Sequence, residues 1–515
     1  EDVQAIEGFI RACREPAFIE PGEDPIPLAS GAFAIDRTSR GTYLQCWSER
    51  KSFNRRVLSV EHESRGKLHL VTERFGKRVG TAWIADLAIR ADAVREGRRL
   101  KFREQFRRFL SRQFTGWTIA EISTGADLEH SLSPAYTRAM LTRGSSVAAA
   151  IGAPLDSKDP HGALTFGLIW LDYLRKRMPE RYIETLTILV PSGMERVTCD
   201  RVRHLRGVQF QVFAHGDEGG ECLLDLADYG NFTTRVEPCR SMTPYPSWLA
   251  PVLQVPGVEA IARPDGGLSI RVRGLEFVHI SSGSALSPNE SPIRFGIDRR
   301  KPASERNANE VLSLARHLAA ARNAGSPRTS PLFRRYPEAW LESQVRASID
   351  EIDAELAPSP VYGQVPAFAA AERGLIDLLA ADRYGRLAVI ELKASADIHL
   401  PLQALDYWMR VKWHLERGEF ARSGHFPGLP LRSDPPKLYL LAPALEFHPA
   451  NETVLRYFAS GIQVERVGLS LEWRQRLKVA SRSAESAGSQ SRNYTQHGFW
   501  RSQGNPARDL ESESG

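Results

Sequence analysis

The sequence has few cysteines and no paired cysteine motif. Only five cysteines occur in 515 residues, and they are odd in number and scattered, without a C-x-x-C spacing (Cys13, Cys46, Cys199, Cys222 and Cys239). The thirteen histidines likewise show no H-x-x-x-H spacing. These absences argue against a disulfide framework and against a structural zinc site. They favour a reducing compartment, so we expect a cytoplasmic protein.

Long apolar runs and nucleotide-reading motifs are also missing. No run of eighteen apolar residues occurs, so we expect no membrane span. No signal peptide, with a basic segment followed by an apolar one, is found after Glu1. The sequence does not begin with methionine, so it stays open whether the first residues of the protein have been removed. The chain has no G-x-x-x-x-G-K-[ST] loop, so it shows no sign of a built-in ATP motor. It also has no helix-turn-helix or zinc-finger pattern. The sequence therefore does not show whether a nucleic-acid partner would be DNA or RNA, or single-stranded or double-stranded.

The charge balance is mildly basic. The net charge is +6, and a content of 42% hydrophobic and 25% charged residues is ordinary for a globular protein long enough for about three domains. Such a charge is compatible with a nucleic-acid partner but does not require one.

One basic segment is more local. Residues 98–114 combine an apolar stripe with arginines spread over the remaining surface of a helix. The plain interpretation is a solvated helix whose stripe packs in a core, and the alternative is contact with phosphates. The candidate phosphate contacts are Arg99, Arg103 and Arg107.

The most informative stretch is residues 374–395, GLIDLLAADRYGRLAVIELKAS, in which two apolar runs flank a five-residue turn at 382–386. If the two strands pair symmetrically about Tyr384, Asp377 lies opposite Glu391, and Lys393 projects from the same face. Two opposed carboxylates repel each other, so a cation is expected between them. Mg²⁺ is held in proteins by one or two carboxylates together with water and phosphate, which suits this pair.

An alternative to the metal site is that these charges form a surface ion pair on a half-exposed strand. The segments on either side help to choose between the two. A helical period at 337–356 carries Glu342 beside its apolar stripe, and residues 360–370 have strand character. A helix is expected to follow Asp397, with Gln403, Tyr407 and Arg410 on its polar face. A strand at 437–445, a helix at 450–460 and a strand at 462–471 complete the series.

This series of elements resembles the PD-(D/E)XK nuclease superfamily, in particular the branch with RecB-like and structure-specific endonucleases. The resemblance covers residues 331 to 480, with Ile376 where the family has its proline. It implies a restriction-endonuclease-like αβββαβ core. It also implies an acidic residue on one strand, Glu-x-Lys on the next, and a glutamine and a tyrosine on the following helix, here Asp377, Glu391, Lys393, Gln403 and Tyr407.

The resemblance implies a Mg²⁺- or Mn²⁺-dependent phosphodiesterase, with DNA as the expected substrate of an endonuclease. Asp377, Glu391 and the main-chain carbonyl of Leu392 would hold the metal, and Glu342 would assist. Lys393 would position the attacking water, and Arg410 would contact nucleic acid. Two alternatives stay open: a non-catalytic nucleic-acid-binding or scaffold protein built on a nuclease fold, and a hydrolase of another phosphate.

A similar series of elements occurs earlier in the chain. Residues 167–214 repeat the order helix, strand ending in proline, helix and strand, and both long helices contain Leu-Asp-Tyr. Matching SVAAAIGA to LAVIELKA places Ala150 at Glu391 and Gly152 at Lys393, and counting back places Tyr136 at Asp377. The prediction is a second, inactive nuclease-like domain. The alternative is chance, because strand-helix-strand units are common.

The expected fold class is therefore α/β and multidomain, with an antiparallel β region at the N-terminus. The expected boundaries are 1–90 for a small β-rich region, 91–216 for the α/β domain that resembles a degenerate nuclease, 217–300 for a β-rich segment, 301–336 for a connector with one helix, 337–480 for the nuclease domain and 481–515 for a disordered tail.

Overall fold

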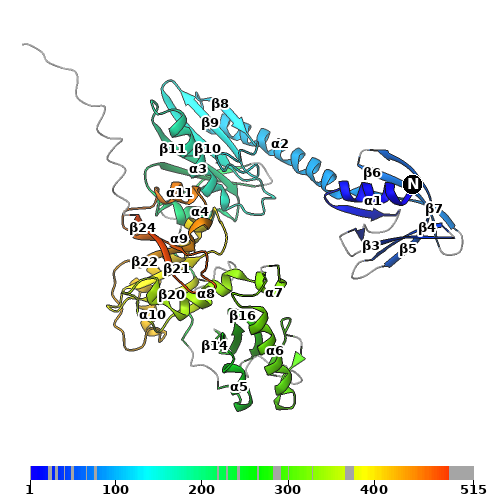
Figure 1. Ribbon diagram of the computed structural model, residues 1–515. Helices are drawn as coiled ribbons and strands as arrows, with labels where there is room; N and C mark the ends of the chain where they lie inside the picture. Colours follow the sequence, from blue (N-terminus) through cyan, green and yellow to red (C-terminus); the bar gives the residue numbers. More distant parts are fainter. Residues whose placement is uncertain are drawn as a thin grey trace, which may run out of the picture. The chain divides into compact units, whose positions relative to one another are not determined.

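The structure is a computed structural model (Figure 1). It describes residues 2–20, 26–28, 33–39, 41–47, 52–64, 66–74, 78–216, 220–227, 230–239, 244–263, 266–281, 292–299, 301–327, 329–365 and 376–485. The chain divides into two compact units, Glu1–Thr115 and Gly116–Gly515. Within the described residues, no helix is long and apolar enough to cross a membrane.

The first unit is built around a seven-stranded antiparallel sheet in the order β2-β1-β7-β6-β5-β4-β3. Its elements are α1 (Asp2–Ala12), β1 (Pro16–Ile19), β2 (Ile26–Pro27), β3 (Phe33–Thr38), β4 (Gly41–Trp47), β5 (Ser52–Ser64), β6 (Lys67–Arg74), β7 (Arg78–Asp86) and α2 (Leu87–Gln113). Alternate residues of these strands face a core that also takes Ile6 and Phe9 of α1. The antiparallel β region expected at residues 1–90 is therefore a seven-stranded sheet.

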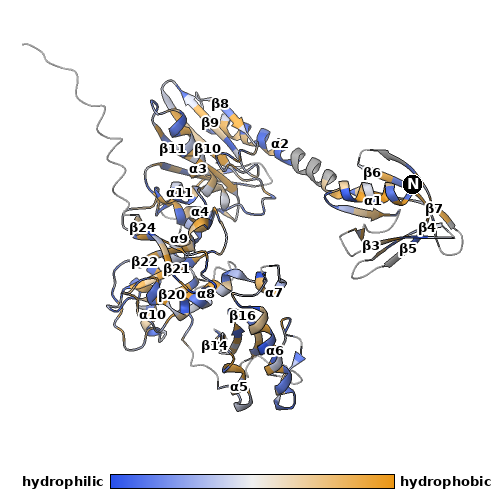
Figure 2. Cartoon of the chain, viewed as in Figure 1, coloured by the Kyte–Doolittle hydropathy of each residue, from blue (hydrophilic) through white to orange (hydrophobic). Residues whose placement is uncertain are grey.

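Helix α2 begins at an aspartate cap and is rich in hydrophilic residues (Figure 2). The Asp86 carboxylate accepts a hydrogen bond from the amide of Ala88 at 3.0 Å, which satisfies one of the free N–H groups at the helix start. Phe102, Phe106 and Phe109 of its apolar stripe are buried. The helix belongs to the first unit, which ends at Thr115, so the division falls after α2 and not at residue 90.

Two six-stranded sheets of the second unit share one topology. The upstream sheet runs β13-β12-β11-β10-β9-β8 and the downstream sheet runs β24-β23-β22-β21-β20-β19. In both, the first three strands along the chain pair antiparallel, the third to fifth pair parallel, and the sixth is antiparallel. The strands are β8 (Thr118–Ser123), β9 (Thr137–Arg143), β10 (Ser146–Gly152), β11 (Ile183–Pro191), β12 (Gln209–His215), β13 (Glu221–Leu223), β19 (Tyr362–Val365), β20 (Ile376–Ala381), β21 (Leu387–Leu392), β22 (Lys437–Pro443), β23 (Val464–Leu469) and β24 (Val479–Glu485).

The helices that connect the parallel strands lie between the two sheets (Figure 1). They are α3 (Gly162–Arg177) and α4 (Glu195–Val202) in the upstream half, and α9 (Leu400–Glu416) and α11 (Ala450–Leu455) in the downstream half. The short helix α10 (Glu419–Arg422) follows α9. Leu168 and Leu171 of α3, Leu405 of α9 and Val454 of α11 belong to one continuous hydrophobic core. Because a parallel sheet needs its faces covered, each half uses the helices of the other to complete its burial.

A five-stranded antiparallel sheet lies between these two halves in the sequence. It consists of β14 (Val258–Ala262), β15 (Leu268–Val272), β16 (Leu275–Ile280), β17 (Ile293–Phe295) and β18 (Lys301–Pro302), and it packs with α5 (Ala250–Leu253) and α6 (Ala308–Ala321). Arg322 fastens this region to the next one. Its buried guanidinium donates to the carbonyl oxygens of Arg273 (3.1 Å), Leu332 (2.9 Å) and Tyr336 (2.8 Å).

Three expected elements differ from the observed ones. The helix expected at 337–356 ends early: α8 covers Pro337–Ala347, and a short 3-10 turn follows at Ile349–Glu351. Of the strand expected at 360–370, the structure shows β19 at Tyr362–Val365. Residues 366–370 lie outside the described residues. The prediction of a disordered tail from residue 481 is wrong for its first five residues, because residues 481–485 belong to β24 and pair with β23. Residues 486–515 lie outside the described residues.

Candidate active site

The hairpin of β20 and β21 sets the geometry of the site. The Asp382 carboxylate accepts hydrogen bonds from the amides of Tyr384 (2.8 Å) and Arg386 (2.9 Å), and Gly385 takes a φ of +88° that favours glycine. The turn gives a register in which Leu379 lies opposite Val389 and Leu378 lies opposite Ile390. One step further, this register brings Asp377 opposite Glu391.

The two carboxylates are close enough to influence each other. Oδ2 of Asp377 accepts a hydrogen bond from the Leu392 amide at 3.0 Å, so the Leu392 main chain meets this aspartate through its N–H group. Burial raises the pKa of Asp377. Burial, followed by the charge of Asp377, raises the pKa of Glu391 well above its usual value, and only 2% of Glu391 is exposed. Oε2 of Glu391 has no hydrogen-bond partner in the part of the chain that the structure describes.

Lys393 lies beside this pair at the end of β21. Its Nζ is 3.2 Å from Oε1 of Glu391 and 3.9 Å from Oδ2 of Asp397. Burial alone would lower the pKa of Lys393, but the charges of Glu391, Glu338 and Asp377 raise it overall. The lysine is therefore a cationic hydrogen-bond donor and not a base.

Helix α9 brings Gln403 and Tyr407, one turn apart, to the same region. Burial raises the pKa of Tyr407 far above its usual value, and the negative charges of Glu391 and Asp377 raise it further. The hydroxyl group thus stays protonated, and it lies within the field of both carboxylates. Oε1 of Gln403 is buried and has no hydrogen-bond partner among the described residues.

Helix α8 contributes Glu342, which has an arginine partner. Its Oε1 accepts a hydrogen bond from Arg346 at 2.8 Å, and only 4% of the residue is exposed. Burial raises the pKa of Glu342, while the charges of Arg346 and Arg271 oppose this shift. Gly363 leaves room for the pair, because a Cβ atom there would lie 2.6 Å from Oε1. Glu342 therefore acts on the site through its charge on Asp377 while Arg346 holds its carboxylate.

Sequence reasoning missed two acidic residues near Lys393. Glu338 lies one helical turn before Glu342 and acts on both Lys393 and Asp377. The i, i+4 spacing of these two glutamates on one helix was a usable signal. Asp397 was expected only as a helix cap. Its Oδ1 accepts a hydrogen bond from the His399 amide at 2.8 Å, and its Oδ2 faces Lys393.

The predicted nucleic-acid contacts are carried by two helices, α9 and α2. Arg410 is half-buried on α9, and its positive charge acts on Tyr407 and on Asp200 of α4. Arg99 and Arg103 of α2 are half-buried. Arg107 is exposed and lies 3.6 Å from Glu104.

The site fits a divalent cation held by two carboxylates. Within the described residues, no group of three or more His, Cys, Asp or Glu side chains is arranged to hold a metal. Mg²⁺, however, commonly takes only one or two protein carboxylates and fills its remaining positions with water and phosphate oxygens. The unpartnered Oε2 of Glu391 beside Asp377 is the kind of buried oxygen that such a cation would satisfy.

The upstream sheet has different residues at the equivalent positions. The amide of Lys393 donates to the carbonyl of Leu441, and that of Ala153 donates to the carbonyl of Leu189, both at 2.9 Å. These two carbonyls lie two residues before the proline that ends each strand. Ala153 is thus the counterpart of Lys393.

The counterpart of Glu391 is then Ile151, which pairs with Arg138, the counterpart of Asp377. We call Arg138, Ile151 and Ala153 the counterpart site. The predicted alignment of Ala150, Gly152 and Tyr136 is wrong. The upstream hairpin closes with Arg143 opposite Ser146 around a two-residue turn, in place of the five-residue turn downstream.

Arg138 occupies the counterpart site with a positive charge. Only 7% of Arg138 is exposed, its Nη1 donates to the Gly125 carbonyl at 2.8 Å, and its guanidinium lies 5.6 Å from the ring centre of Trp170. The nearby acids have partners of their own: Asp127 contacts His130 at 2.9 Å, and Glu121 contacts Arg177 at 2.8 Å.

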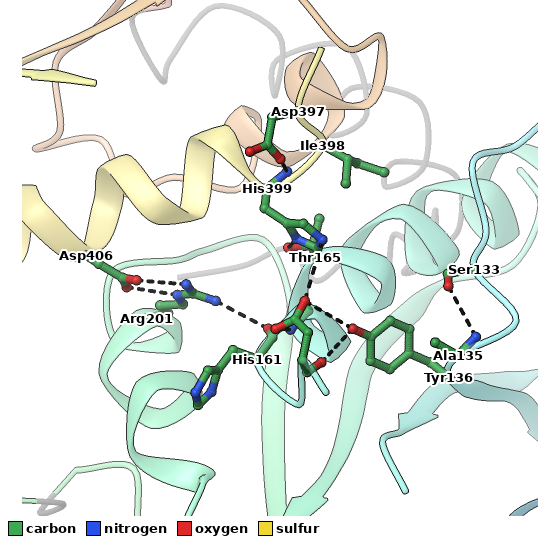
Figure 3. Close-up of polar contacts among 12 residues, drawn as sticks. Ser133, Ala135, Tyr136, His161, Thr165, Arg201, Asp397, Ile398, His399 and Asp406 are labelled. Carbon is green, nitrogen blue, oxygen red and sulfur yellow. Dashed lines mark hydrogen bonds and ion pairs between the residues drawn. The ribbon is translucent and has the colours of Figure 1, made fainter. Parts of the chain in front are cut away.

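The two halves meet across an approximate two-fold axis. Leu205 and Phe458 form an antiparallel bridge, with the Arg206 amide donating to Tyr457 and the Ala459 amide donating to His204. The aspartates of the two Leu-Asp-Tyr sequences make reciprocal ion pairs. Asp406 pairs with Arg201, as Figure 3 shows, and Asp172 pairs with Arg456, with N–O distances of 2.8 Å. The repeated tripeptide therefore stabilises an isologous interface within one chain.

No protein-family model, curated protein or solved structure matches the chain. A functional assignment therefore depends on the side chains described above.

Proposed function

We propose that the downstream sheet and its helices form a metal-dependent nuclease domain of the PD-(D/E)XK type, with a restriction-endonuclease-like fold, that hydrolyses phosphodiester bonds in DNA as an endonuclease. The observation that carries the proposal is the buried pair of Asp377 and Glu391 with Lys393 beside it. We further propose that the upstream sheet is an inactive copy of the same fold. The common strand order of the two sheets supports this second proposal.

Asp377 and Glu391 are the residues that would hold a divalent cation. When bound there, Mg²⁺ or Mn²⁺ would supply positive charge that favours ionisation of the attacking water and offsets negative charge on the phosphate. Both carboxylates must be ionised to do this, and their raised pKa values make them easier to protonate than ordinary carboxylates. Cation binding and proton binding therefore compete at this pair.

Lys393 and Tyr407 supply hydrogen-bond donors. The Lys393 ammonium, kept charged by Glu391, Glu338 and Asp377, would orient the attacking water and stabilise negative charge that develops on the phosphoryl oxygens. The Tyr407 hydroxyl, kept protonated by burial, would donate to an oxygen of the substrate or of the carboxylate pair. Gln403, with a free buried oxygen, would accept a hydrogen bond from Lys393 or from the attacking water.

The reaction that these groups serve is a simple hydrolysis. The oxygen of water attacks phosphorus, the bond from phosphorus to the 3′ oxygen breaks, and the leaving oxygen takes a proton. As the resemblance implies, the products are a 3′-hydroxyl and a 5′-phosphate.

Purified protein incubated with supercoiled plasmid, single-stranded, flap and junction DNAs and an RNA tests the proposal, in Mg²⁺, Mn²⁺ or EDTA. We expect cleavage that requires the metal and is lost in Lys393→Ala. Asp377→Asn, which keeps the shape of the side chain, is the matched variant for loss of cation binding. The pattern of substrates that are cut identifies the nucleic acid.

Absence of cutting on every substrate, with salt-sensitive DNA binding that survives in Lys393→Ala, would contradict the proposal. That result would favour the non-catalytic scaffold. Cutting by Asp377→Asn at the wild-type rate would also remove the assigned role of the carboxylate pair.

A further inference from the structure

A short series of polar contacts runs from the active site toward its counterpart site in the upstream half. Asp397, which lies 3.9 Å from Lys393, accepts a hydrogen bond from the His399 amide. Nδ1 of His399 is 3.0 Å from Oγ1 of Thr165, and its Nε2 is 3.6 Å from a carboxylate oxygen of Asp159.

The contacts continue into the upstream half. The Tyr136 hydroxyl donates to the same Asp159 at 3.3 Å, and Tyr136 lies two residues before Arg138 on β9 (Figure 3). Thr165 and His399 each lie seven residues before the aspartate of their own Leu-Asp-Tyr sequence, so equivalent positions touch here. A series of polar contacts thus runs from Lys393 in the active site to Tyr136, two residues from Arg138 of the counterpart site.

The counterpart site has none of the groups that hydrolysis requires. Ile151 offers no oxygen to a cation and Ala153 offers no ammonium. The buried guanidinium of Arg138 stands where the active site has Asp377, and its positive charge repels a divalent cation. This site is inert for the chemistry assigned to the other.

Two-fold symmetry matters for a duplex substrate. The strands of duplex DNA run antiparallel, so two sites related by a two-fold axis face one strand each, as half-sites do in dimeric DNA-binding proteins. With one site inert, only one strand meets the catalytic groups.

Resting on the proposed function, we infer that the protein is a nicking enzyme that hydrolyses one strand of a DNA duplex in each binding event. One water adds to one phosphorus, and one bond to a 3′ oxygen breaks. The strand beside the counterpart site keeps all of its phosphodiester bonds.

The test is a time course with supercoiled plasmid in Mg²⁺, with enzyme limiting, that measures supercoiled, nicked and linear DNA. We expect nicked circles to be the first product, and linear DNA to follow only after a lag, as independent nicks come to lie opposite each other. Linear DNA present from the earliest times in proportion to total cleavage, at the lowest enzyme concentration, would overturn the inference.

Other outcomes separate this inference from the proposed function. Early linear DNA that disappears with Lys393→Ala leaves the nuclease assignment standing while the nicking inference fails. The same holds for cleavage confined to single-stranded or flap DNA with the duplex untouched. Absence of metal-dependent cleavage on every nucleic acid means that the proposed function itself fails, and the inference falls with it.

Discussion

The two six-stranded sheets have the same strand order, the same strand directions and helices at the same connections, yet their polar residues differ completely at one position on each of two strands. The downstream sheet has opposed acids, Asp377 and Glu391, where the upstream sheet has Arg138 and Ile151. The comparison teaches that one strand arrangement can carry either a pair of opposed acids or a buried arginine at the same position. The two sheets therefore differ in chemistry at a few side chains of their second and third strands, while the strand order is the same.

The largest expected effect contrasts Asp377 with its counterpart. We expect Asp377→Asn to lower the cleavage rate on the order of 1,000-fold, because a neutral amide no longer holds the cation. Arg138→Met should leave the rate within about twofold, because the counterpart site takes no part in chemistry. Cleavage rates at saturating Mg²⁺ measure both, with thermal unfolding as a check that each variant folds. Equal losses in the two variants would break the comparison.

The second contrast concerns the reciprocal ion pairs. Arg201 is 8% exposed in its side chain and donates two hydrogen bonds to Asp406, whereas Arg456 is 37% exposed in its pair with Asp172. Arg201→Met leaves the Asp406 carboxylate, 15% exposed, without its bidentate partner and should cost about 3–5 kcal/mol of unfolding free energy. Arg456→Met should cost about 1 kcal/mol or less.

Urea unfolding of both variants measures this difference. A double variant, Arg201→Met with Asp406→Leu, should recover much of the loss, because no unpaired buried charge remains. Similar losses for the two single variants would show that burial does not distinguish the two sides of the interface.

The third contrast uses Glu391, whose counterpart is apolar. The pKa of Glu391 is raised in the folded protein above its ordinary 4.5, so above pH 4.5 the folded state binds more protons than the unfolded state. Stability without metal therefore falls as pH rises through that window, until the folded pKa is passed. Glu391→Gln should remove this fall and stabilise the metal-free protein at neutral pH by about 1–3 kcal/mol.

Thermal unfolding in EDTA from about pH 5 to about pH 8 provides the measurement. Added Mg²⁺ should stabilise the wild type and leave Glu391→Gln unchanged. A variant that is less stable than the wild type at neutral pH in EDTA would mean that Lys393 satisfies Glu391 fully.

The smallest contrast concerns the tyrosines of the repeated Leu-Asp-Tyr. Tyr407 lies in the field of both carboxylates, whereas Tyr173 stacks on Trp170 with ring centres 5.4 Å apart. Tyr407→Phe should lower kcat by up to about tenfold, because the transition state loses the free energy of about one hydrogen bond. Tyr173→Phe should leave kcat unchanged. Steady-state cleavage rates of both variants test this prediction. An equal effect of the two substitutions would mean that both tyrosines contribute only to packing.

The hairpin could be predicted from the sequence because its own turn specifies it. Asp382 and Gly385 give a five-residue turn centred on Tyr384, and the register that places Asp377 opposite Glu391 follows by counting. No information from distant residues is needed. Local turn chemistry therefore gave the strongest part of the candidate site.

The alignment of the two halves could not be obtained in the same way. The apolar runs match equally well one residue apart, and a slip of one residue moves each side chain to the other face of the sheet. Only the contact of each strand with its parallel neighbour, Ala153 with Leu189 and Lys393 with Leu441, fixes the match. Arg346 as the partner of Glu342, by contrast, follows from i, i+4 spacing on α8 and was predictable from the sequence.

The single hydrophobic core between the two sheets also has an evolutionary consequence. In a homodimer, each mutation of a catalytic residue would appear in both subunits, whereas two linked copies can change independently. Under the proposed function, the upstream copy would be released from selection on chemistry. Leu168 and Leu171 would still be constrained by packing, because they share a core with α9, the helix that carries Gln403 and Tyr407. The upstream half would then persist as a structural subunit of the proposed nuclease domain.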